Sequence, residues 1–138
     1  MPATESPVYT AKVSVTGGRE GHAISDDGRL DLSLTRPGAA GTGTNPEQLF
    51  AAGYAACFQS AMGSVARQRG VDVSKSVIES SVSLYRGEGS FYLGVTMRVS
   101  IPGLALDEIQ DLVDAAHQVC PYSNATRGNI DVSFEVAN

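Results

Sequence analysis

The first third of the chain has the period-two pattern of half-buried strands. Apolar and polar positions alternate over residues 9–16, which predicts a strand that two glycines end. A strand over residues 22–25 and a return strand over residues 30–34 are predicted on either side of the Asp-Asp-Gly sequence at 26–28, which favours a tight hairpin turn. A Gly- and Thr-rich stretch over residues 36–45 then predicts a loop.

The pattern changes to that of a long helix after this loop. Asn45 is a good N-cap, Pro46 suits the first helical position, and a carboxylate in the first turn is favoured by the helix dipole. No charged side chain occurs from Leu49 to Phe58. A helix that is apolar all round is typically buried, so we expect a buried helix that ends near residues 67–70.

The second half of the chain predicts two strands, a helix and a last strand. Strands are expected over residues 77–85 and 91–101, the second of which alternates most clearly. A helix is expected over residues 107–120 and should end at a proline, before a strand over residues 130–136. The apolar positions at helical spacing are Ile109, Leu112, Val113, Ala116, Val119 and Cys120. The order βββ-α-ββ-α-β indicates an α+β fold of hairpins packed on helices.

Length and composition add limits to this interpretation. The 138 residues suit one domain over residues 1–138, and 42% of them are apolar, enough for a sizeable core. The formal net charge of −5, with no cluster of Lys or Arg, argues against a nucleic-acid partner. We see no apolar run of the roughly 18 residues that would cross a membrane and no signal peptide, so we expect a cytoplasmic protein.

The two cysteines are the candidates for chemistry. Cys57 and Cys120 are 63 positions apart, and both fall on apolar helical surfaces. Each one alone has an equally ordinary interpretation as a small buried residue. Two thiols that meet in a reducing compartment are more often a working redox pair than a structural disulfide. Two cysteines and two histidines at these spacings do not make a closed zinc site.

Three segments of the sequence resemble one known family. The segments TNPEQLFAAGYAACF at residues 44–58 and VCPYSNATRGNIDV at residues 119–132 are similar to the two signature segments of the organic hydroperoxide resistance (Ohr) proteins. The segment GGREG at residues 17–21 also matches, and the order of elements agrees along nearly the whole chain. These proteins form a branch of the OsmC family of osmotically inducible proteins.

The resemblance implies a fold, an activity and a set of site residues. It implies an OsmC-like fold in an intertwined homodimer, with sheets wrapped around central helices and active sites at the subunit interface. It implies reduction of alkyl and fatty-acid hydroperoxides to alcohols, without a bound cofactor or metal and with electrons from a lipoylated protein. Carried over position by position, Cys57 is the peroxidatic cysteine, Cys120 the resolving cysteine, Arg19 the catalytic arginine and Glu47 the catalytic glutamate.

These residue types fit that chemistry. A thiolate rather than a thiol cleaves a peroxide, and burial in an apolar helix disfavours the thiolate. A guanidinium, which is always charged, would stabilise it, and a carboxylate would hold the guanidinium by a bidentate pair. The sequence alone does not single out Arg19 from Arg36 or Arg127. His22 and His117 are expected to be structural.

Glu47 poses a problem of geometry. It lies ten positions before Cys57 on the same predicted helix, or roughly 15 Å at 1.5 Å per residue. Three arrangements would bring both residues to one site: Glu47 from the partner subunit, a break in the helix at Gly53, or a long arginine that spans part of the gap.

Other functions remain open at this point. The chain could belong to the sister branch of the same fold, be a redox sensor that switches a partner protein, or bind a ligand with inert cysteines. If it is a peroxidase, an apolar pocket should favour bulky hydroperoxides over hydrogen peroxide. The residues that we expect to supply this pocket are Leu49, Phe50, Phe58, Met62 and Tyr122.

Overall fold

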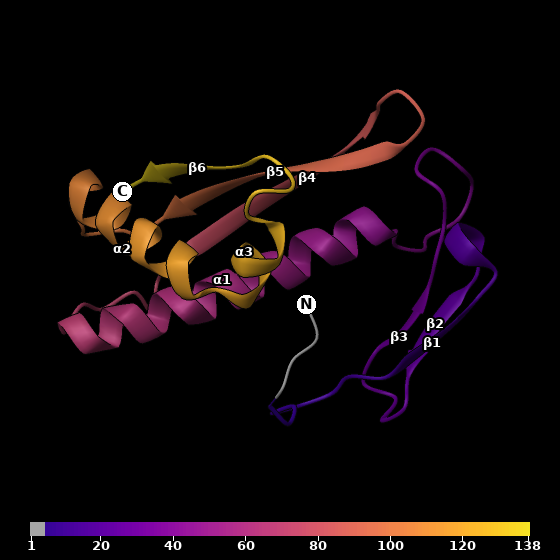
Figure 1. Cartoon of the computed structure of the whole chain (residues 1–138), viewed down its shortest axis with the longest axis horizontal. Helices are drawn as coiled ribbons and strands as arrows, with labels where there is room; N and C mark the ends of the chain where they lie inside the picture. The colour runs from indigo at the N-terminus through magenta and orange to yellow at the C-terminus, as the bar shows by residue number, and fades with distance from the viewer. Residues whose placement is uncertain (1–4) are drawn as a thin grey trace. The chain divides into compact units, whose positions relative to one another are not determined.

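The structure, a computed structural model, describes residues 5–138. The chain divides into two compact units, one of which ends at Pro46 while the other comprises Glu47–Asn138. In Figure 1 the first unit carries the indigo and purple strands, and the second runs from magenta to yellow. The single domain over residues 1–138 stays a prediction.

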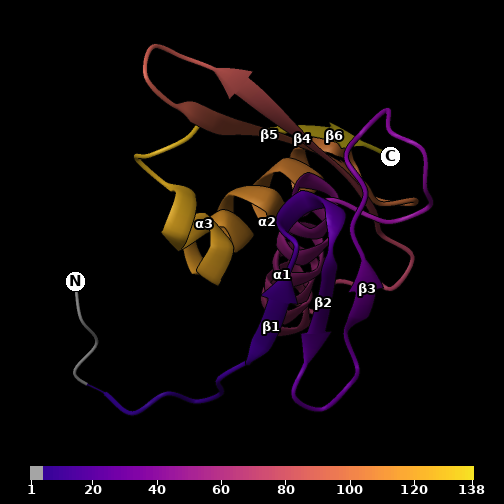
Figure 2. The same ribbon diagram turned by 90° about the vertical axis from the view of Figure 1, so that its right-hand side faces the viewer.

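The N-terminal unit is built on a three-stranded antiparallel sheet. Its strands are β1 (Val13–Thr16), β2 (His22–Ser25) and β3 (Asp31–Ser33), in the order β1-β2-β3, and Figure 2 shows them side by side. The predicted strand over residues 9–16 therefore begins four residues late. Its paired residues end at Val13–Ser25. One further hydrogen bond joins the Asp26 N–H to the carbonyl of Lys12 at 3.0 Å, and from Asp26 on the partner segment forms the hairpin turn. The turn itself is confirmed, with Gly28 at a positive φ of 73°.

The C-terminal unit is a sheet with its helices on one face. Its elements are α1 (Pro46–Arg69), β4 (Val77–Arg86), β5 (Phe91–Ser100), α2 (Leu106–Val119), α3 (Pro121–Thr126) and β6 (Val132–Ala137). Strand β5 is central, antiparallel to β4 and parallel to β6. Figures 1 and 2 both show the helices on the same side of this sheet. The predicted α+β class is confirmed, and both predicted strands of the hairpin lie within one residue of the observed ends.

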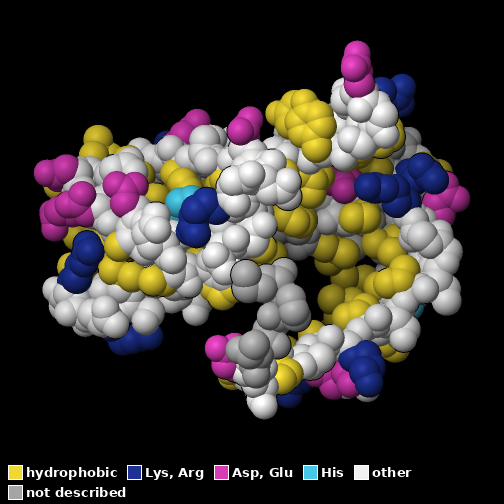
Figure 3. All heavy atoms as spheres, viewed as in Figure 1, with side chains coloured by type: hydrophobic (Ala, Val, Ile, Leu, Met, Phe, Trp, Pro, Cys, Tyr) yellow, Lys and Arg dark blue, Asp and Glu magenta, His cyan; other side chains and the backbone are white. Residues whose placement is uncertain are grey.

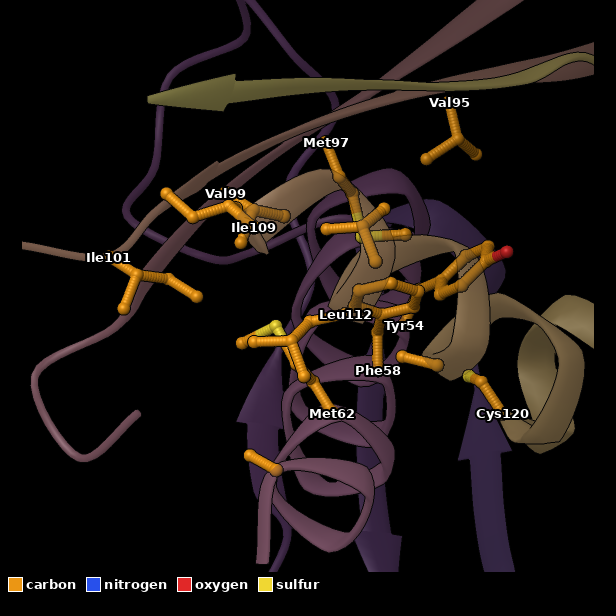
Figure 4. Close-up of a cluster of buried hydrophobic side chains, with 13 residues drawn as sticks. Tyr54, Phe58, Met62, Val95, Met97, Val99, Ile101, Ile109, Leu112 and Cys120 are labelled. Atoms are coloured by element: carbon orange, nitrogen blue, oxygen red, sulfur yellow. The ribbon is translucent and has the colours of Figure 1, made fainter. Parts of the chain in front are cut away.

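One stripe of α1 supplies the centre of the core. Tyr54, Phe58, Met62 and Ala66 recur every four residues and are buried, which is the spacing of one helical face. They pack against the inner face of β5 and against α2, as Figure 4 shows for the labelled side chains. The prediction that α1 is buried all round is wrong within this chain. Its small residues, such as Ala52 and Ala56, form a second face that is open.

Helix α2 has one apolar face and ends differently from the prediction. Five of the six predicted core residues are buried: Ile109, Leu112, Val113, Ala116 and Cys120. Val119 is 61% exposed, so its predicted place in the core is wrong. Cys120 is fully buried but follows the last helical residue with an extended backbone.

Helix α3 was not predicted. Pro121 was interpreted only as the end of a helix, and it does end α2 because it has no N–H to continue the hydrogen bonds. The same residue occupies the first position of α3, where no N–H is needed.

The surface and the longest helix bear on two classes that the sequence argued against, nucleic-acid-binding and membrane-spanning proteins. Acidic side chains gather over α2 on the face shown in Figure 3, and α2 carries Asp107, Glu108, Asp111 and Asp114. By length and composition alone, α1 is long and apolar enough to cross a membrane, with a mean hydropathy of 1.2 in its best window. The helix contains no unbroken apolar run of that length, because polar residues such as Gln59 and Ser60 interrupt it. One helix of this kind is weak support for a membrane span, because core helices of globular proteins pass the same test.

Candidate functional site

Two cysteines that are far apart in sequence lie in contact. Cys57 lies at the middle of α1, and Cys120 lies where α2 ends and α3 begins. Their sulfur atoms are 3.7 Å apart, and both thiols are free. Cys57 is partly exposed whereas Cys120 is completely buried, so the two thiols differ in access to solvent. A disulfide needs about 2.0 Å between the sulfur atoms, so only a small movement separates this pair from a bond.

The surroundings of Cys57 act on its thiol in opposite directions. Burial is the largest effect and raises the pKa of Cys57, while the backbone N–H of Tyr122 lowers it and the neighbouring Cys120 raises it. The net pKa lies above its ordinary value, so a further positive charge is required to make Cys57 a thiolate at neutral pH.

Three aromatic rings from α1 and α3 cover this region. The ring of Tyr122 lies 6.2 Å from Phe50 and 5.6 Å from Tyr54, measured between centroids. Gly53 makes room for it, because a Cβ at this position would lie 2.7 Å from the Tyr122 hydroxyl oxygen. The absence of a side chain at Gly53 therefore lets the first turn of α3 approach α1 beside Cys57.

An apolar groove lies next to the rings. It has a volume of about 740 Å³, and its lining residues include Phe50, Phe91, Leu93, Tyr122 and Ile130. Of the five residues expected to form an apolar pocket, Phe50 and Tyr122 line this groove. Phe58 and Met62 are completely buried in the core instead, and Leu49 does not line the groove.

Hydroxyl groups and one histidine surround the start of α3. The hydroxyl of Tyr54 lies 2.8 Å from Ser123 Oγ, and His117 Nδ1 lies 2.7 Å from the same oxygen. Burial lowers the pKa of His117, and the charge of Arg127 lowers it further, while Asp114 acts in the opposite direction. His117 was expected to be structural, and it does bond to a residue of the segment after Cys120.

Glu47 lies in the first turn of α1, on the same unbroken helix as Cys57. Ten residues of continuous helix separate them, so their backbones are roughly 15 Å apart along the axis. The predicted alternative of a helix break at Gly53 is therefore wrong. Gly53 serves a packing role against Tyr122 instead.

Arg19 belongs to the N-terminal unit, where glycines shape its turn. It is the middle residue of a short 3₁₀ turn, Gly18–Glu20, which comes after Gly17 in the left-handed region at φ 74°. A Cβ at Gly21 would fall only 1.7 Å from the carbonyl oxygen of Thr16, so no other residue fits there without a change of backbone. The turn is thus a defined structure rather than a loose loop.

An ion pair ties this turn to a neighbouring loop. Arg36 Nε donates to Glu20 Oε1 at 2.6 Å, and the N–H of Leu34 donates to the carbonyl of Gly21 at 2.9 Å. Arg36, one of the arginines that the sequence left open, therefore already has a carboxylate partner.

Two residues of the site and one backbone group were missed from sequence alone. Tyr54, Ser123 and the backbone N–H of Tyr122 act across 60 to 70 positions of sequence, and nothing in their local patterns indicates this. The one available signal was Pro121, which suits a helix start as well as a helix end. Among residues 5–138, no cluster of three or more His, Cys, Asp or Glu side chains is placed to hold a metal ion.

Comparison of the sequence with known proteins gives a consistent result. The family described as OsmC-like protein matches residues 38–135. The chain is 54% identical over 142 residues to the organic hydroperoxide resistance protein of Xanthomonas axonopodis pv. citri, an alignment that covers 99% of this chain and 100% of that protein. It is 52% identical over 134 residues to the organic hydroperoxide resistance protein OhrB of Bacillus subtilis, with coverages of 94% and 98%.

Solved structures agree with the sequences. The crystal structure of Bacillus subtilis OhrB is similar with a TM-score of 0.89 and covers 94% of this chain and 99% of that chain. The structure of an organic hydroperoxide resistance protein from Legionella pneumophila is 47% identical, with a TM-score of 0.90 and coverages of 96% and 100%. The predicted OsmC-like fold is confirmed. The chain belongs to the OsmC-like family, and within it to the organic hydroperoxide resistance proteins.

Proposed function

We propose that this protein is a cysteine-based peroxidase that reduces organic hydroperoxides. The observation that carries the proposal is the contact between Cys57 and Cys120, at 3.7 Å between sulfur atoms, with one thiol partly exposed and the other buried. The exposed member suits a nucleophile that must meet a substrate, and the buried member suits a partner that reacts only with the first. The relatives named for organic hydroperoxide resistance support a role in defence against these compounds.

The proposed cycle uses both thiols and balances. The Cys57 thiolate attacks the peroxide O–O bond, which breaks to leave a sulfenic acid on Cys57 and an alkoxide that takes up a proton to become the alcohol. The Cys120 thiol then attacks the Cys57 sulfur and a disulfide forms. The hydroxyl of the sulfenic acid leaves as water with the proton of the Cys120 thiol. A dithiol returns the pair to two thiols and is itself oxidised to a disulfide.

The raised pKa of Cys57 gives the cation a specific task in this proposal. We assign Arg19 to it, because a guanidinium remains charged and its fork of donors also suits the peroxide oxygens. Glu47 would hold that guanidinium by a bidentate pair. The unbroken α1 leaves two arrangements, a long arginine that spans part of the gap or Glu47 from the partner subunit. We propose that Glu47 serves the site that contains Cys57 of the partner subunit in a homodimer.

The open face of α1 is consistent with such a dimer. Small residues allow two helices to approach closely, and this face carries Ala52, Ala56 and Gly63. Gln59, Ser60 and Arg67 lie on the same side of the helix, so the small side chains rather than an apolar surface are what suit a close partner helix.

The groove beside Tyr122 supports a preference for bulky substrates. Each CH₂ group of a substrate buried there would contribute about 0.8 kcal/mol. Hydrogen peroxide has no such group, so alkyl and fatty-acid hydroperoxides are the proposed substrates.

For the electron donor we propose a lipoylated protein of the cytoplasm. The disulfide includes the buried Cys120, so a reductant on a long, flexible, apolar arm has an advantage over one whose thiols lie on a folded surface. A lipoyl dithiol has that shape, and it can close its own ring to release the mixed disulfide.

A peroxide-consumption assay tests the proposal. Tert-butyl hydroperoxide, a fatty-acid hydroperoxide and hydrogen peroxide would each be offered with dihydrolipoamide, with thioredoxin and its reductase, or with glutathione. We expect multiple turnovers with dihydrolipoamide and higher kcat/KM for the organic peroxides. A single turnover with every donor would indicate a redox sensor instead, and no thiol oxidation would indicate a binding protein with inert cysteines.

A further inference from the structure

A buried chain of hydrogen bonds crosses from α1 to α3 beside the cysteine pair. The Tyr54 hydroxyl lies 2.8 Å from Ser123 Oγ and 3.2 Å from Thr126 Oγ1, and Ser123 Oγ lies 2.7 Å from His117 Nδ1. Tyr54 and Ser123 are completely buried and Thr126 is 5% exposed. Figure 4 shows the Tyr54 hydroxyl at the margin of the hydrophobic cluster, at the side where Cys120 lies.

Every member of this chain can be satisfied at once. Thr126 Oγ1 donates to the carbonyl of Ser123, and a neutral His117 offers an acceptor to the Ser123 hydroxyl. The proton of Tyr54 then goes to Ser123 Oγ or to Thr126 Oγ1. A buried polar group without a partner is costly, so such a chain specifies one position of α3 against α1 and disfavours its neighbours.

Helix α3 depends on these hydrogen bonds for its position against α1. It has only six residues, far fewer than a helix needs to be stable by itself. Two groups of the site lie at its start, the thiol of Cys120 and the backbone N–H of Tyr122. Cys120 is fixed through its backbone to both helices, since its N–H donates to Ala116 at 2.9 Å and its carbonyl accepts from Asn124 at 3.0 Å. A shift of α3 therefore moves the Cys120 sulfur relative to Cys57.

We propose that the hydrogen-bond chain of Tyr54, Ser123 and His117 is a positioning device for disulfide formation. It holds Cys120 Sγ and the Tyr122 N–H against the Cys57 sulfur, so that the resolving thiol attacks the sulfenic acid before a second peroxide does. The inference rests on the proposed peroxidase cycle. None of the three residues touches the peroxide in this proposal, and they act through the place of α3.

Substitutions that remove one hydroxyl test the device. Ser123→Ala removes the bonds to Tyr54 and His117, and Tyr54→Phe removes the bonds to Ser123 and Thr126 while its ring stays in the aromatic cluster. His117→Leu removes the imidazole nitrogen, whereas His117→Asn retains a polar group near the place of Nδ1. Thr96→Val is the matched control, because it deletes a hydrogen bond to Ser133 between β5 and β6, away from the cysteines.

The measurement separates the two oxidation steps. Reduced protein is mixed with a small excess of tert-butyl hydroperoxide, and sulfenic acid, disulfide and sulfinic acid are monitored by rapid quenching and mass spectrometry. Ser123→Ala, Tyr54→Phe and His117→Leu should form the disulfide roughly tenfold more slowly, since small misplacements of reacting groups have effects of this size or larger. The rate of Cys57 oxidation should change much less, so the sulfinic acid should accumulate.

A second readout is independent of the disulfide. The thiolate absorbance of Cys57 should titrate at higher pH in the Ser123→Ala variant, because the Tyr122 N–H no longer favours the thiolate. His117→Asn and Thr96→Val should behave like the unsubstituted protein in both readouts. Thermal unfolding of the Tyr54→Phe variant verifies that the effect belongs to a folded protein.

The outcomes distinguish the two proposals. Disulfide formation as fast in Ser123→Ala and Tyr54→Phe as in the unsubstituted protein overturns the positioning role and leaves the peroxidase proposal standing. If the unsubstituted protein consumes peroxide but forms no Cys57–Cys120 disulfide, the proposed cycle is wrong, and the positioning role falls with it.

Discussion

Cys57 lies in the middle of α1, a helix of 24 residues, whereas Cys120 lies between α2 and the six-residue α3. Regular backbone hydrogen bonds on both sides fix the position of Cys57. Cys120 depends on an end of one helix, the start of another and side-chain hydrogen bonds that reach α3 from Tyr54 and His117. The two sulfur atoms are in contact, but we expect the local stability of the short α3 side to be lower than that of α1.

This difference suits a division of labour between the thiols. A nucleophile must keep one position to meet a substrate, and a long helix packed by a buried stripe provides that. A resolving cysteine must close about 1.7 Å to form the bond, and a short helix allows a small shift. The fixed side of the pair should therefore control the first oxidation, and the adjustable side should control formation of the disulfide.

The largest expected effect comes from removing each sulfur in turn. Cys57→Ser should abolish peroxide reduction, because no nucleophile remains. Cys120→Ser should permit one turnover and then stall as sulfenic acid, which further peroxide converts to sulfinic acid. Rapid-mixing measurement of the first turnover, with mass spectrometry of the product, compares them. Equal loss of the first turnover in both variants would contradict the division of labour.

The next effect concerns the charge that the Cys57 side requires. Arg19→Met should reduce kcat/KM at pH 7 by about 100-fold and move the rise of the pH–rate profile to higher pH, since each unit of thiol pKa is tenfold in thiolate. The sign is set by the raised pKa of Cys57, which a nearby cation would offset. Arg19→Lys keeps the charge but not the fork, and should recover part of the activity. Unchanged profiles in both variants would exclude Arg19 from this role.

Mixed dimers test whether Glu47 and Cys57 of one site come from different subunits. Chains with Glu47→Ala and chains with Cys57→Ser should each be nearly inactive alone. After unfolding and refolding together at equal amounts, a twofold dimer with shared sites should regain about a quarter of the full activity, because half of the dimers hold one intact site of two. No regain in a mixture whose heterodimers are verified by mass spectrometry would place Glu47 and Cys57 in the same subunit's site.

A smaller effect is expected where Tyr122 of α3 packs against α1. Gly53→Ala adds a Cβ that would lie 2.7 Å from the Tyr122 hydroxyl oxygen, so the ring must move. Tyr122 is 38% exposed and can swing outward, and alanine favours a helix over glycine by about 1 kcal/mol. The thermal midpoint should therefore stay equal or rise, while kcat/KM for bulky hydroperoxides falls several-fold.

Sequence patterns predicted the long strands and the long helix that holds Cys57 well. The alternation in β5 and the charge-free run in α1 each extend over ten or more residues, so the period is clear and the elements appear where expected. The family resemblance named Cys57 and Cys120, and their contact is now seen. The strand expected from residue 9 failed because alternation alone does not supply a pairing partner.

The adjustable side was predicted least well, for physical reasons. Val119 has the correct spacing for the core, yet it lies at the last residue of α2, where the helix end leaves it exposed. Helix α3 is too short to leave a periodic signal, and its stability comes from hydroxyls such as that of Tyr54, 69 positions from Ser123. Interactions of this range depend on tertiary structure and leave no local pattern.

The smallest expected effect tests whether His117 is held neutral as part of the adjustable side. Burial, with help from Arg127, lowers its pKa below 6.5, against the opposing charge of Asp114. The unfolded chain therefore binds a proton more readily than the folded chain does. The stabilisation of the folded protein by neutral His117 is present above about pH 6.5 and is lost as the pH falls toward the lowered pKa.

Urea denaturation of the reduced protein at pH 8, 7, 6 and 5, at one protein concentration, should show this decline in the free energy of unfolding, and His117→Asn should make it shallower. Asp27 and Asp72, whose pKa values are lowered below 3.8, act only at lower pH. Parallel curves for the two proteins would mean that protonation of His117 does not oppose the folded position of α3.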